Sequence, residues 1–353
     1  MQPPGNQVDS RMFRGLAVDD SGGARWFRTA SILCQLPDCM AAFDIATLNL
    51  FCAIGLSGDE GLDPESCFQQ VLRWTKHVEN YTSRCLPRYH SAPEEFERSV
   101  AKFKMLCMVT ALQRDLGVKY YMPFSEGEYN ASDSQNLFIH GILSGHGGTC
   151  VSMPALYVAI GRRLGYPLHM VRSKEHWFVR WQDASERFNI EATSPGFCPN
   201  DDAHYHTNPK PLTEQEIKGG FYLRNLSPRE ELACFLNQRA HCLLDNLRFA
   251  DSAMTFKLAH SITADDWSIH YGWAAATVLH SAVARAARNC AFGGDSKIDL
   301  RTLRMPEPVA EWERWGMPAA RRELDRIISV TSKDCLFLRR STKEESDGCH
   351  IKS

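Results

Sequence analysis

The sequence has little net charge and no long apolar run. Its 40 lysines and arginines nearly balance its 42 aspartates and glutamates, so the formal net charge of the 353-residue chain is −2. A chain so close to neutral has no global field that would attract nucleic acid or an acidic membrane surface. No stretch approaches the ~20 consecutive apolar residues of a membrane-spanning helix. We therefore expect no nucleic acid and no membrane among its partners.

The sequence also lacks the short motifs that hold common cofactors and metals. It contains no phosphate-binding loop, no dinucleotide-binding glycine fingerprint and no calcium loop of the DxDxDG type. Cys198, His204 and His206 share one short polar loop, but structural zinc sites usually combine two ligand pairs, and a second pair is missing. The sequence therefore predicts no cofactor and no metal.

The cysteines indicate a reducing compartment. All 13 are scattered along the chain without a CxxC pair, and their number is odd. Residues 1–30 contain no apolar segment of the kind found in a secretory signal. Reduced thiols in a cytoplasmic protein are the expectation.

Helical spacing of apolar residues dominates the chain on both sides of a central stretch. The predicted helices cover Cys39–Leu56, Asp63–Arg84, Glu94–Leu116, Glu230–Arg248, Ala264–Arg288 and Pro306–Ser329. The sequence thus predicts a flexible lead, an N-terminal helical region, a mixed core, a C-terminal helical region and a disordered tail, over residues 1–30, 31–125, 126–211, 212–335 and 336–353.

The central stretch offers a thiol at the start of a helix. Gly147 and Gly148 allow a tight turn before Cys150, and an apolar helix follows that ends at Gly165. Because Pro154 has no N–H, we expect the regular helix to begin after Cys150 and to leave the thiol in the turn before it. The positive end of a helix stabilises a thiolate, which is the reactive form of cysteine.

A base and an acid follow the thiol on two predicted strands. The first strand opens at His176, and the second, RFNIEAT (187–193), carries Glu191. If the loop 183–186 joins them so that Gln182 pairs with Arg187, His176 and Glu191 become diagonal neighbours on one face. Diagonal neighbours lie roughly 7–8 Å apart at the backbone, within reach of long side chains. A thiol, a base and an orienting acid in this order are typical of nucleophilic catalysis.

Three segments of this stretch resemble the transglutaminase-like superfamily: GGTCVSMPALYVAIGRRLGYP (147–167), EHWFVRW (175–181) and FNIEATSPG (188–196). The resemblance implies an α+β, helix-rich fold with a papain/transglutaminase-like core, a small antiparallel sheet and flanking helical layers. It also implies the triad Cys150, His176 and Glu191, although the acid of that family is usually Asp. DSQNLFIHGILSGHGG (133–148) and the later helices further resemble a bacterial branch in which tetratricopeptide-like helices follow the core.

Other polar residues are candidates for supporting roles. The backbone N–H of Cys150 is a natural donor to an oxyanion, and the side-chain amide of Gln135 or Asn136 is a second candidate. Asn189 lies on the same predicted strand face as Glu191 and is a substitute orienter of His176. For the amides, an ordinary loop-capping role is the alternative.

These observations lead to two functional hypotheses. The first is a thiol-dependent acyl-transfer enzyme acting on a protein or peptide substrate at peptide or glutamine carboxamide bonds. Hydrolysis is slightly favoured over transamidation, because calcium-dependent transglutaminases carry calcium sites and additional domains of which this sequence shows no sign. The second is an inactive transglutaminase-like fold that binds a partner protein, with the C-terminal helices as part of the binding surface.

Overall fold

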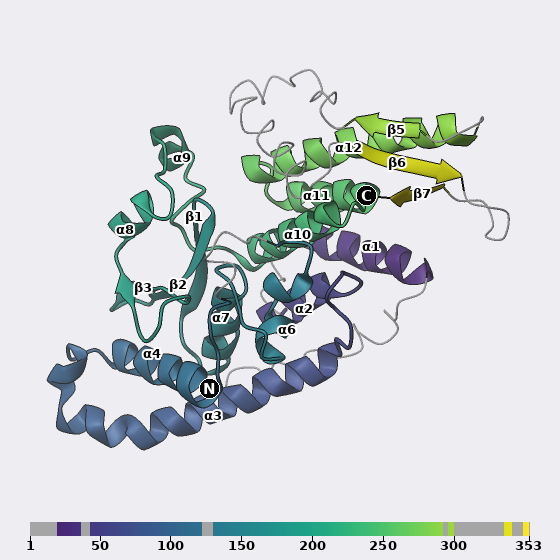
Figure 1. The fold of residues 1–353 in the computed structure, drawn as a ribbon. Helices are drawn as coiled ribbons and strands as arrows, with labels where there is room; N and C mark the ends of the chain where they lie inside the picture. Colours follow the sequence, from purple (N-terminus) through teal and green to yellow (C-terminus); the bar gives the residue numbers. More distant parts are fainter. Residues whose placement is uncertain are drawn as a thin grey trace. The chain divides into compact units, whose positions relative to one another are not determined.

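The computed structural model describes residues 20–36, 43–121, 130–291, 296–299, 335–340 and 349–352. The chain divides into two compact units, Met1–Phe235 and Leu236–Ser353. The predicted site residues all belong to the first unit. Its fold is helix-rich α+β with a small antiparallel sheet, as predicted (Figure 1).

Four antiparallel strands form the sheet of the first unit, in the order β1–β2–β3–β4. The strand β2 follows the predicted HWFVRWQ pattern, and the sequence reading did not single out β1 or β4. The outer edge of β1 is covered, since Leu223 donates to the carbonyl of Arg172 and Leu226 to that of Met170. The strands are β1 (Leu168–Ser173), β2 (His176–Gln182), β3 (Arg187–Ile190) and β4 (Pro199–Asn200).

The turn between β2 and β3 has the predicted length. Gln182 pairs with Arg187, and the N–H of Asp183 donates to the carbonyl of Glu186 at 3.0 Å. Asp183 also accepts hydrogen bonds from the backbone of Ser185 and Glu186. Because this side chain occupies the turn donors, the register of β2 against β3 is fixed locally.

The helix α7 (Met153–Arg163) forms the centre of the first unit. Residues 153–161 are all buried, and the helix packs against β1, β2 and the helices α2 and α3. Gly165 ends it with a φ of 74°, as the sequence predicts for a glycine at this position. The turn that contains Cys150 is therefore joined directly to a helix buried in the core.

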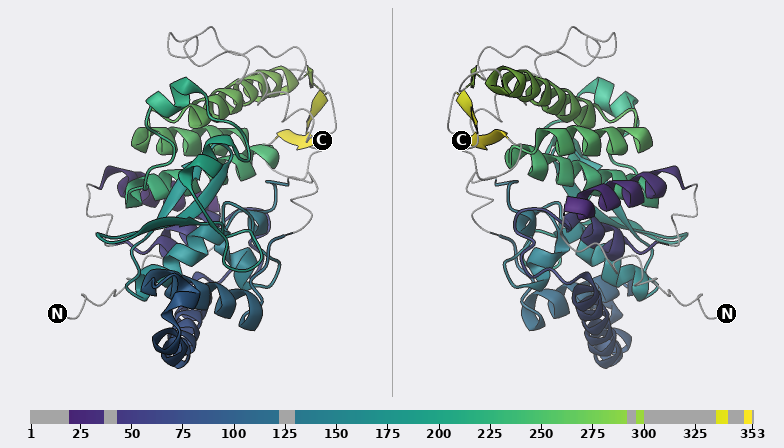
Figure 2. Two further views of the ribbon diagram at one scale, coloured as in Figure 1. Left: turned by 90° about the vertical axis from the view of Figure 1, so that its left-hand side faces the viewer. Right: turned by 90° about the vertical axis from the view of Figure 1, so that its right-hand side faces the viewer.

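The N-terminal helices are longer or more divided than predicted. The helix α3 (Pro64–Ser91) begins at the predicted cap Asp63 but continues past Arg84 through Pro87. The predicted helix Glu94–Leu116 splits into η3, α4 and the π-helical turn η4, because Glu97 and Arg98 have left-handed backbone angles and break it. α3 and α4 lie side by side (Figures 1 and 2). The bounds are η3 (Pro93–Phe96), α4 (Val100–Thr110) and η4 (Ala111–Asp115).

The flexible lead predicted for residues 1–30 is wrong from Asp20 onward. The helix α1 (Asp20–Gln35) includes Trp26, whose ring is 2% exposed and stacks on Phe51 at 5.1 Å. The Trp26 indole N–H donates to the Phe51 carbonyl at 2.9 Å. Phe51 belongs to α2 (Ile45–Ala53), which covers part of the predicted Cys39–Leu56 helix. The sequence reading missed α1 because the polar residues around Trp26 outnumber its few buried ones.

Short helices and one long helix complete the first unit. The long helix α10 contains the boundary between the two units and covers most of the predicted Glu230–Arg248 segment. These elements are η5 (Ser134–Asn136), α6 (Ile139–Leu143), α8 (Asp202–Thr207), α9 (Glu214–Lys218) and α10 (Pro228–Asp245).

The second unit contains a helix pair and a small sheet. The helix α12 covers most of the predicted Ala264–Arg288 segment and packs against α11. Three antiparallel strands form the sheet, and two of them, over 335–340 and 349–352, lie in the segment 336–353 that the sequence predicts to be a disordered tail. The predicted helix Pro306–Ser329 lies outside the described residues. The elements are α11 (Phe249–Ile262), α12 (Trp267–Ala291), β5 (Ser296–Asp299), β6 (Cys335–Arg340) and β7 (Cys349–Lys352).

Candidate active site

Cys150 lies in the turn before α7, as its sequence context predicts. The helix begins at Met153, and the turn is closed by bonds from the N–H groups of Ser152 and Met153 to the Thr149 carbonyl. Within the described part of the chain, the N–H of Cys150 has no hydrogen-bond acceptor. A free N–H beside the thiol is a suitable donor to an oxyanion formed there.

The two glycines before Cys150 have separate structural roles. Gly147 has a φ of 119°, which side chains rarely tolerate. Gly148 has little free space, because an added Cβ would lie 2.6 Å from Cγ of Met153 and 2.7 Å from Cδ1 of Ile142. Backbone hydrogen bonds also hold Gly148 against the segment 119–121. The N–H of Tyr121 donates to the Gly148 carbonyl at 2.8 Å.

The structure brings His176 and Glu191 into direct contact. Nε2 of His176 lies 2.7 Å from Oε2 of Glu191. This contact requires the register in which Val179 pairs with Ile190, because it places both side chains on one face of the sheet. Both are largely buried, with 14% and 10% of the His176 and Glu191 side chains exposed.

The thiol lies close to the same imidazole. Burial of His176 disfavours its charged form, but hydrogen bonding and negative charge from Cys150 and Glu191 outweigh burial and raise the pKa of His176 to about 10. Because Glu191 occupies Nε2, Nδ1 is the ring nitrogen left to face Cys150. The site therefore favours a protonated imidazole, held between Cys150 and the carboxylate of Glu191.

Four donors hold the carboxylate of Glu191. Oε2 accepts from His176 and from the Tyr205 hydroxyl, at 2.7 and 3.2 Å. Oε1 accepts from the N–H and the hydroxyl of Thr193, at 3.0 and 2.6 Å. Although burial opposes the charge, the bonds from His176 and Thr193 lower the pKa of Glu191. The carboxylate is thus ionised and fixed in place.

Sequence reasoning missed Thr193 and Tyr205. Thr193 lies two residues after Glu191, near enough for its N–H and its hydroxyl both to reach Oε1 of the carboxylate. Tyr205 belongs to the segment 194–211, which the sequence predicts to be a loop covering one side of the cleft, whereas the structure has the helix α8 there. No local pattern indicates that its hydroxyl reaches Glu191, since the contact depends on how α8 docks on the sheet.

Two of the three supporting candidates from the sequence have side-chain partners outside the predicted triad. Asn189 accepts from Arg180 and donates to Asp202, so it does not orient His176. The Asn136 amide donates to the carbonyl of Asn130, and its oxygen contacts His146. Asn189 is thus held by Arg180 and Asp202, and the oxyanion role of Asn136 stays a prediction.

The role of Gln135 as an oxyanion donor stays a prediction. Its backbone N–H donates to the side chain of Asp133 in a short turn. Tyr120, which the sequence analysis did not name, borders the site instead: burial and the negative charge of Cys150 and Glu191 raise its pKa to about 12. Tyr120 also forms a β-bridge with Gly148.

A glutamine from the π-helical turn anchors the chain after the acid. Nε2 of Gln113 donates to the Tyr157 hydroxyl at 3.1 Å and to the Ser194 carbonyl at 3.0 Å. Its Oε1 accepts from the N–H of Gly196 at 2.7 Å. The bonds tie the loop after Glu191 to α7, the helix that follows the thiol.

The loop cysteine and histidines do not form a metal site. In the part of the chain that the structure describes, no group of three or more His, Cys, Asp or Glu side chains could hold a metal ion. His204 packs edge-on against the Tyr205 ring, with centroids 5.0 Å apart. The segment therefore packs beside the site through Tyr205.

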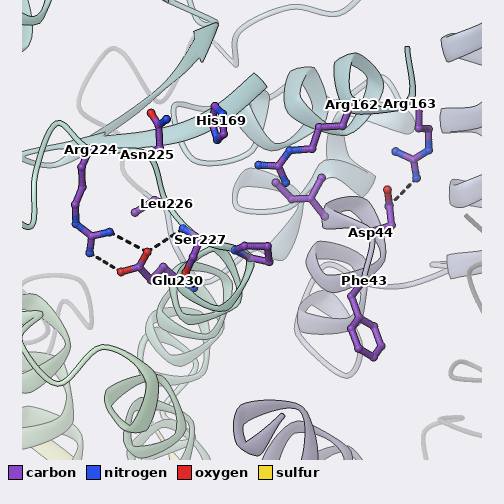
Figure 3. Close-up of a pocket in the computed structure, with 12 residues that line it drawn as sticks. Phe43, Asp44, Arg162, Arg163, His169, Arg224, Asn225, Leu226, Ser227 and Glu230 are labelled. Carbon is purple, nitrogen blue, oxygen red and sulfur yellow. Dashed lines mark hydrogen bonds and ion pairs between the residues drawn. The ribbon is translucent and has the colours of Figure 1, made fainter. Parts of the chain in front are cut away.

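A cavity of about 580 Å³ lies elsewhere in the first unit (Figure 3). Its three arginines are already paired, Arg224 with Glu230, Arg163 with Asp44 and Arg162 with Glu231. None of the predicted triad residues lines it, and each of these arginines has a carboxylate partner, so nothing indicates an anionic ligand. Its lining residues are Phe43, Asp44, Ile45, Arg162, Arg163, His169, Arg224, Asn225, Leu226, Ser227, Pro228 and Glu230.

No helix among the described residues combines the length and apolar character needed to span a membrane.

One family model matches the segment of the chain that contains the candidate site. Residues 69–211 match the family model described as the transglutaminase-like superfamily. This segment includes Cys150, His176 and Glu191, and the resemblance inferred from the sequence is confirmed for it. The bacterial branch and the tetratricopeptide-like helices stay predictions. This superfamily includes cysteine enzymes.

One curated relative is similar over a short segment. F-box only protein 21 of Mus musculus is 38% identical over 63 residues, which are 18% of this chain and 10% of the relative. The similarity thus spans about a tenth of that protein. No solved structure matches significantly.

Proposed function

We propose that this protein is a thiol-dependent acyl-transfer enzyme in which Cys150 is the nucleophile, His176 the base and Glu191 the orienting acid. The main support is the contact between His176 and Glu191 at 2.7 Å, beside the thiol at the start of α7. The family match over residues 69–211 supports the same reading.

In the first half of the reaction, the Cys150 sulfur attacks the carbonyl carbon of a carboxamide or peptide bond. The carbonyl oxygen becomes an oxyanion, which the N–H of Cys150 can bind. His176, protonated in the ion pair with the thiolate, gives its proton to the leaving nitrogen as the C–N bond breaks. The products are an amine or ammonia and a thioester on Cys150.

In the second half, His176 removes a proton from an incoming nucleophile. Water then releases a carboxylic acid, whereas an amine forms a new amide, and in either case the acyl C–S bond breaks and Cys150 is left as a thiolate. Glu191 keeps the imidazole oriented through both halves. We favour water as the acceptor, and hence a protease or deamidase, for a protein or peptide substrate.

The test is the pH dependence of Cys150 alkylation by iodoacetamide, read for each cysteine by peptide mass spectrometry. A thiolate–imidazolium pair predicts fast labelling of Cys150 well below pH ~8.5, the region in which free thiols ionise. His176→Ala should remove this advantage, and the other cysteines serve as internal controls. Labelling as slow as at ordinary cysteines would overturn the proposal.

The alternative is an inactive fold that binds a partner protein. Such a module has no need for a reactive thiol beside an intact His–Glu pair. The alkylation experiment therefore separates the two hypotheses, because the binding module predicts an unreactive Cys150 in the folded protein.

A further inference from the structure

We propose that Tyr205 is a positioning residue for Glu191, and that the docking of α8 on the sheet sets the position of Tyr205. The inference rests on the proposed function, since it assigns a role within the same site. It concerns a residue that neither the sequence motif nor the triad geometry requires.

The first step is the docking of α8 on one face of the sheet. Arg180 and Asn189 form a pair across β2 and β3, and both donate to Oδ1 of Asp202, at 2.7 and 2.8 Å. Arg180 is almost completely buried, whereas 27% of the Asp202 side chain is exposed, so the ion pair closes the buried layer at its surface. The beginning of α8 is therefore fixed over this pair.

The second step follows from helical spacing. Residues three apart lie on the same side of a helix, so Tyr205 faces the sheet together with Asp202. The next pair on that sheet face is Phe178 and Glu191, by continuation of the register. Tyr205 thus lies over this pair as Asp202 lies over the previous one.

The Tyr205 ring has little freedom in this position. It stacks on Phe178 with centroids 3.7 Å apart and planes 6° apart, and it is 1% exposed. It also stacks loosely on His176 at 6.1 Å. Its hydroxyl therefore points in one direction, toward Oε2 of Glu191 at 3.2 Å.

The hydroxyl meets the same carboxylate oxygen that holds His176. Burial and the charge of Glu191 raise the pKa of Tyr205, so it stays a protonated donor. With Oε2 held by Tyr205 and Oε1 by Thr193, the carboxylate cannot turn away from the imidazole. This arrangement lets the long, flexible side chain of glutamate act as an orienting acid, a role for which rigidity is needed.

The test uses Tyr205→Phe, which keeps the stacked ring and removes only the hydroxyl. We expect Cys150 alkylation at pH 6 to slow by about 2- to 10-fold, the worth of one hydrogen bond. The pKa of His176, followed by NMR of its ring, should fall. Tyr166→Phe is the matched control, because that buried ring packs on Trp181 at the other end of β2.

A structural role alone would not move the His176 titration, and the thermal midpoint identifies a folding defect. Should Tyr205→Phe lower Tm by more than about 10 °C, a large change for a chain of this size, both readouts are taken at a temperature at which circular dichroism shows this variant fully folded. The same slower alkylation and lower His176 pKa are expected there.

The decisive comparison repeats Tyr205→Phe in a Glu191→Ala background. A residue that acts through Glu191 has no effect there, so non-additivity supports the inference. An unchanged His176 pKa in Tyr205→Phe, or an equal effect in both backgrounds, overturns it. If wild-type Cys150 is unreactive but Tyr205→Phe still lowers the His176 pKa, Tyr205 keeps its positioning role and only the proposed function fails.

Discussion

His176 and Glu191 lie fifteen positions apart in the chain, yet Nε2 of the imidazole is 2.7 Å from Oε2 of the carboxylate. The turn at 183–186 makes this contact possible, because it sets Gln182 opposite Arg187 and so puts both side chains on one sheet face. A shift of the register by one residue would send Glu191 to the other face. The electrostatics of the site thus depend on a turn at the far end of the two strands.

Glu191→Gln tests how much of the His176 basicity comes from the carboxylate. The pKa of His176 is about 10 because hydrogen bonding and charge from Cys150 and Glu191 outweigh burial. Without the negative charge of Glu191, burial counts for more, so this pKa should fall toward the ordinary value of ~6.5. Below pH 10 the wild type keeps its imidazolium, whereas the variant loses it as pH rises through the lower value. NMR of the His176 ring measures both, and a pKa that stays near 10 contradicts the expectation.

Glu191→Asp tests the length of the acid. The carboxylate of Glu191 is held by Thr193 on one oxygen and by His176 and Tyr205 on the other. A side chain one methylene shorter cannot keep all of these contacts without a backbone shift. We expect the alkylation rate of Cys150 at pH 6 to fall between those of the wild type and Glu191→Gln. A rate equal to that of the wild type would mean that the surrounding donors adapt.

The sequence was enough to predict those features of the site that depend on residues adjacent in the chain. The glycine turn, the position of Cys150 before α7, the strand from His176 and the four-residue turn after Gln182 each follow from a short pattern. Such features depend on backbone preferences and alternation, which neighbouring residues encode.

The features that were missed or wrong depend on contacts between distant segments. Tyr205 reaches Glu191 only because Asp202 binds Arg180, and no spacing in the sequence reports that contact. Asn189 is on the correct face, but the same buried Arg180 takes its oxygen. Trp26 packs on Phe51, and this contact buries one face of a helix in a segment that was predicted to be flexible. Tertiary contacts decided each of these.

Gly148→Ala tests the packing behind the nucleophile. A methyl group there would approach the side chains of Met153 and Ile142 to 2.6 and 2.7 Å, so one of them must move. Overpacking of this kind costs about 1–3 kcal/mol in the free energy of unfolding, measurable by urea denaturation. Gly23→Ala is the control, because no atom lies within 4 Å of the added Cβ. Its stability should not fall, and equal losses in both variants would contradict the packing argument.

Asp202→Ala and Arg187→Ala test how much each ion pair of Asp202 contributes to stability. The carboxylate pairs with the buried Arg180 and with the exposed Arg187. Asp202 contacts Arg180, whose side chain is 2% exposed, and Arg187, whose side chain is 48% exposed. Asp202→Ala leaves the buried guanidinium without its counter-charge, which should lower the free energy of unfolding by about 3 kcal/mol or more. Arg187→Ala removes only a solvated ion pair, which should cost about 1 kcal/mol or less. Urea denaturation measures both losses. Similar losses would mean that the Asn189 and backbone contacts of Arg180 are sufficient to hold its charge, and that Asp202 is not what fixes α8 to the sheet.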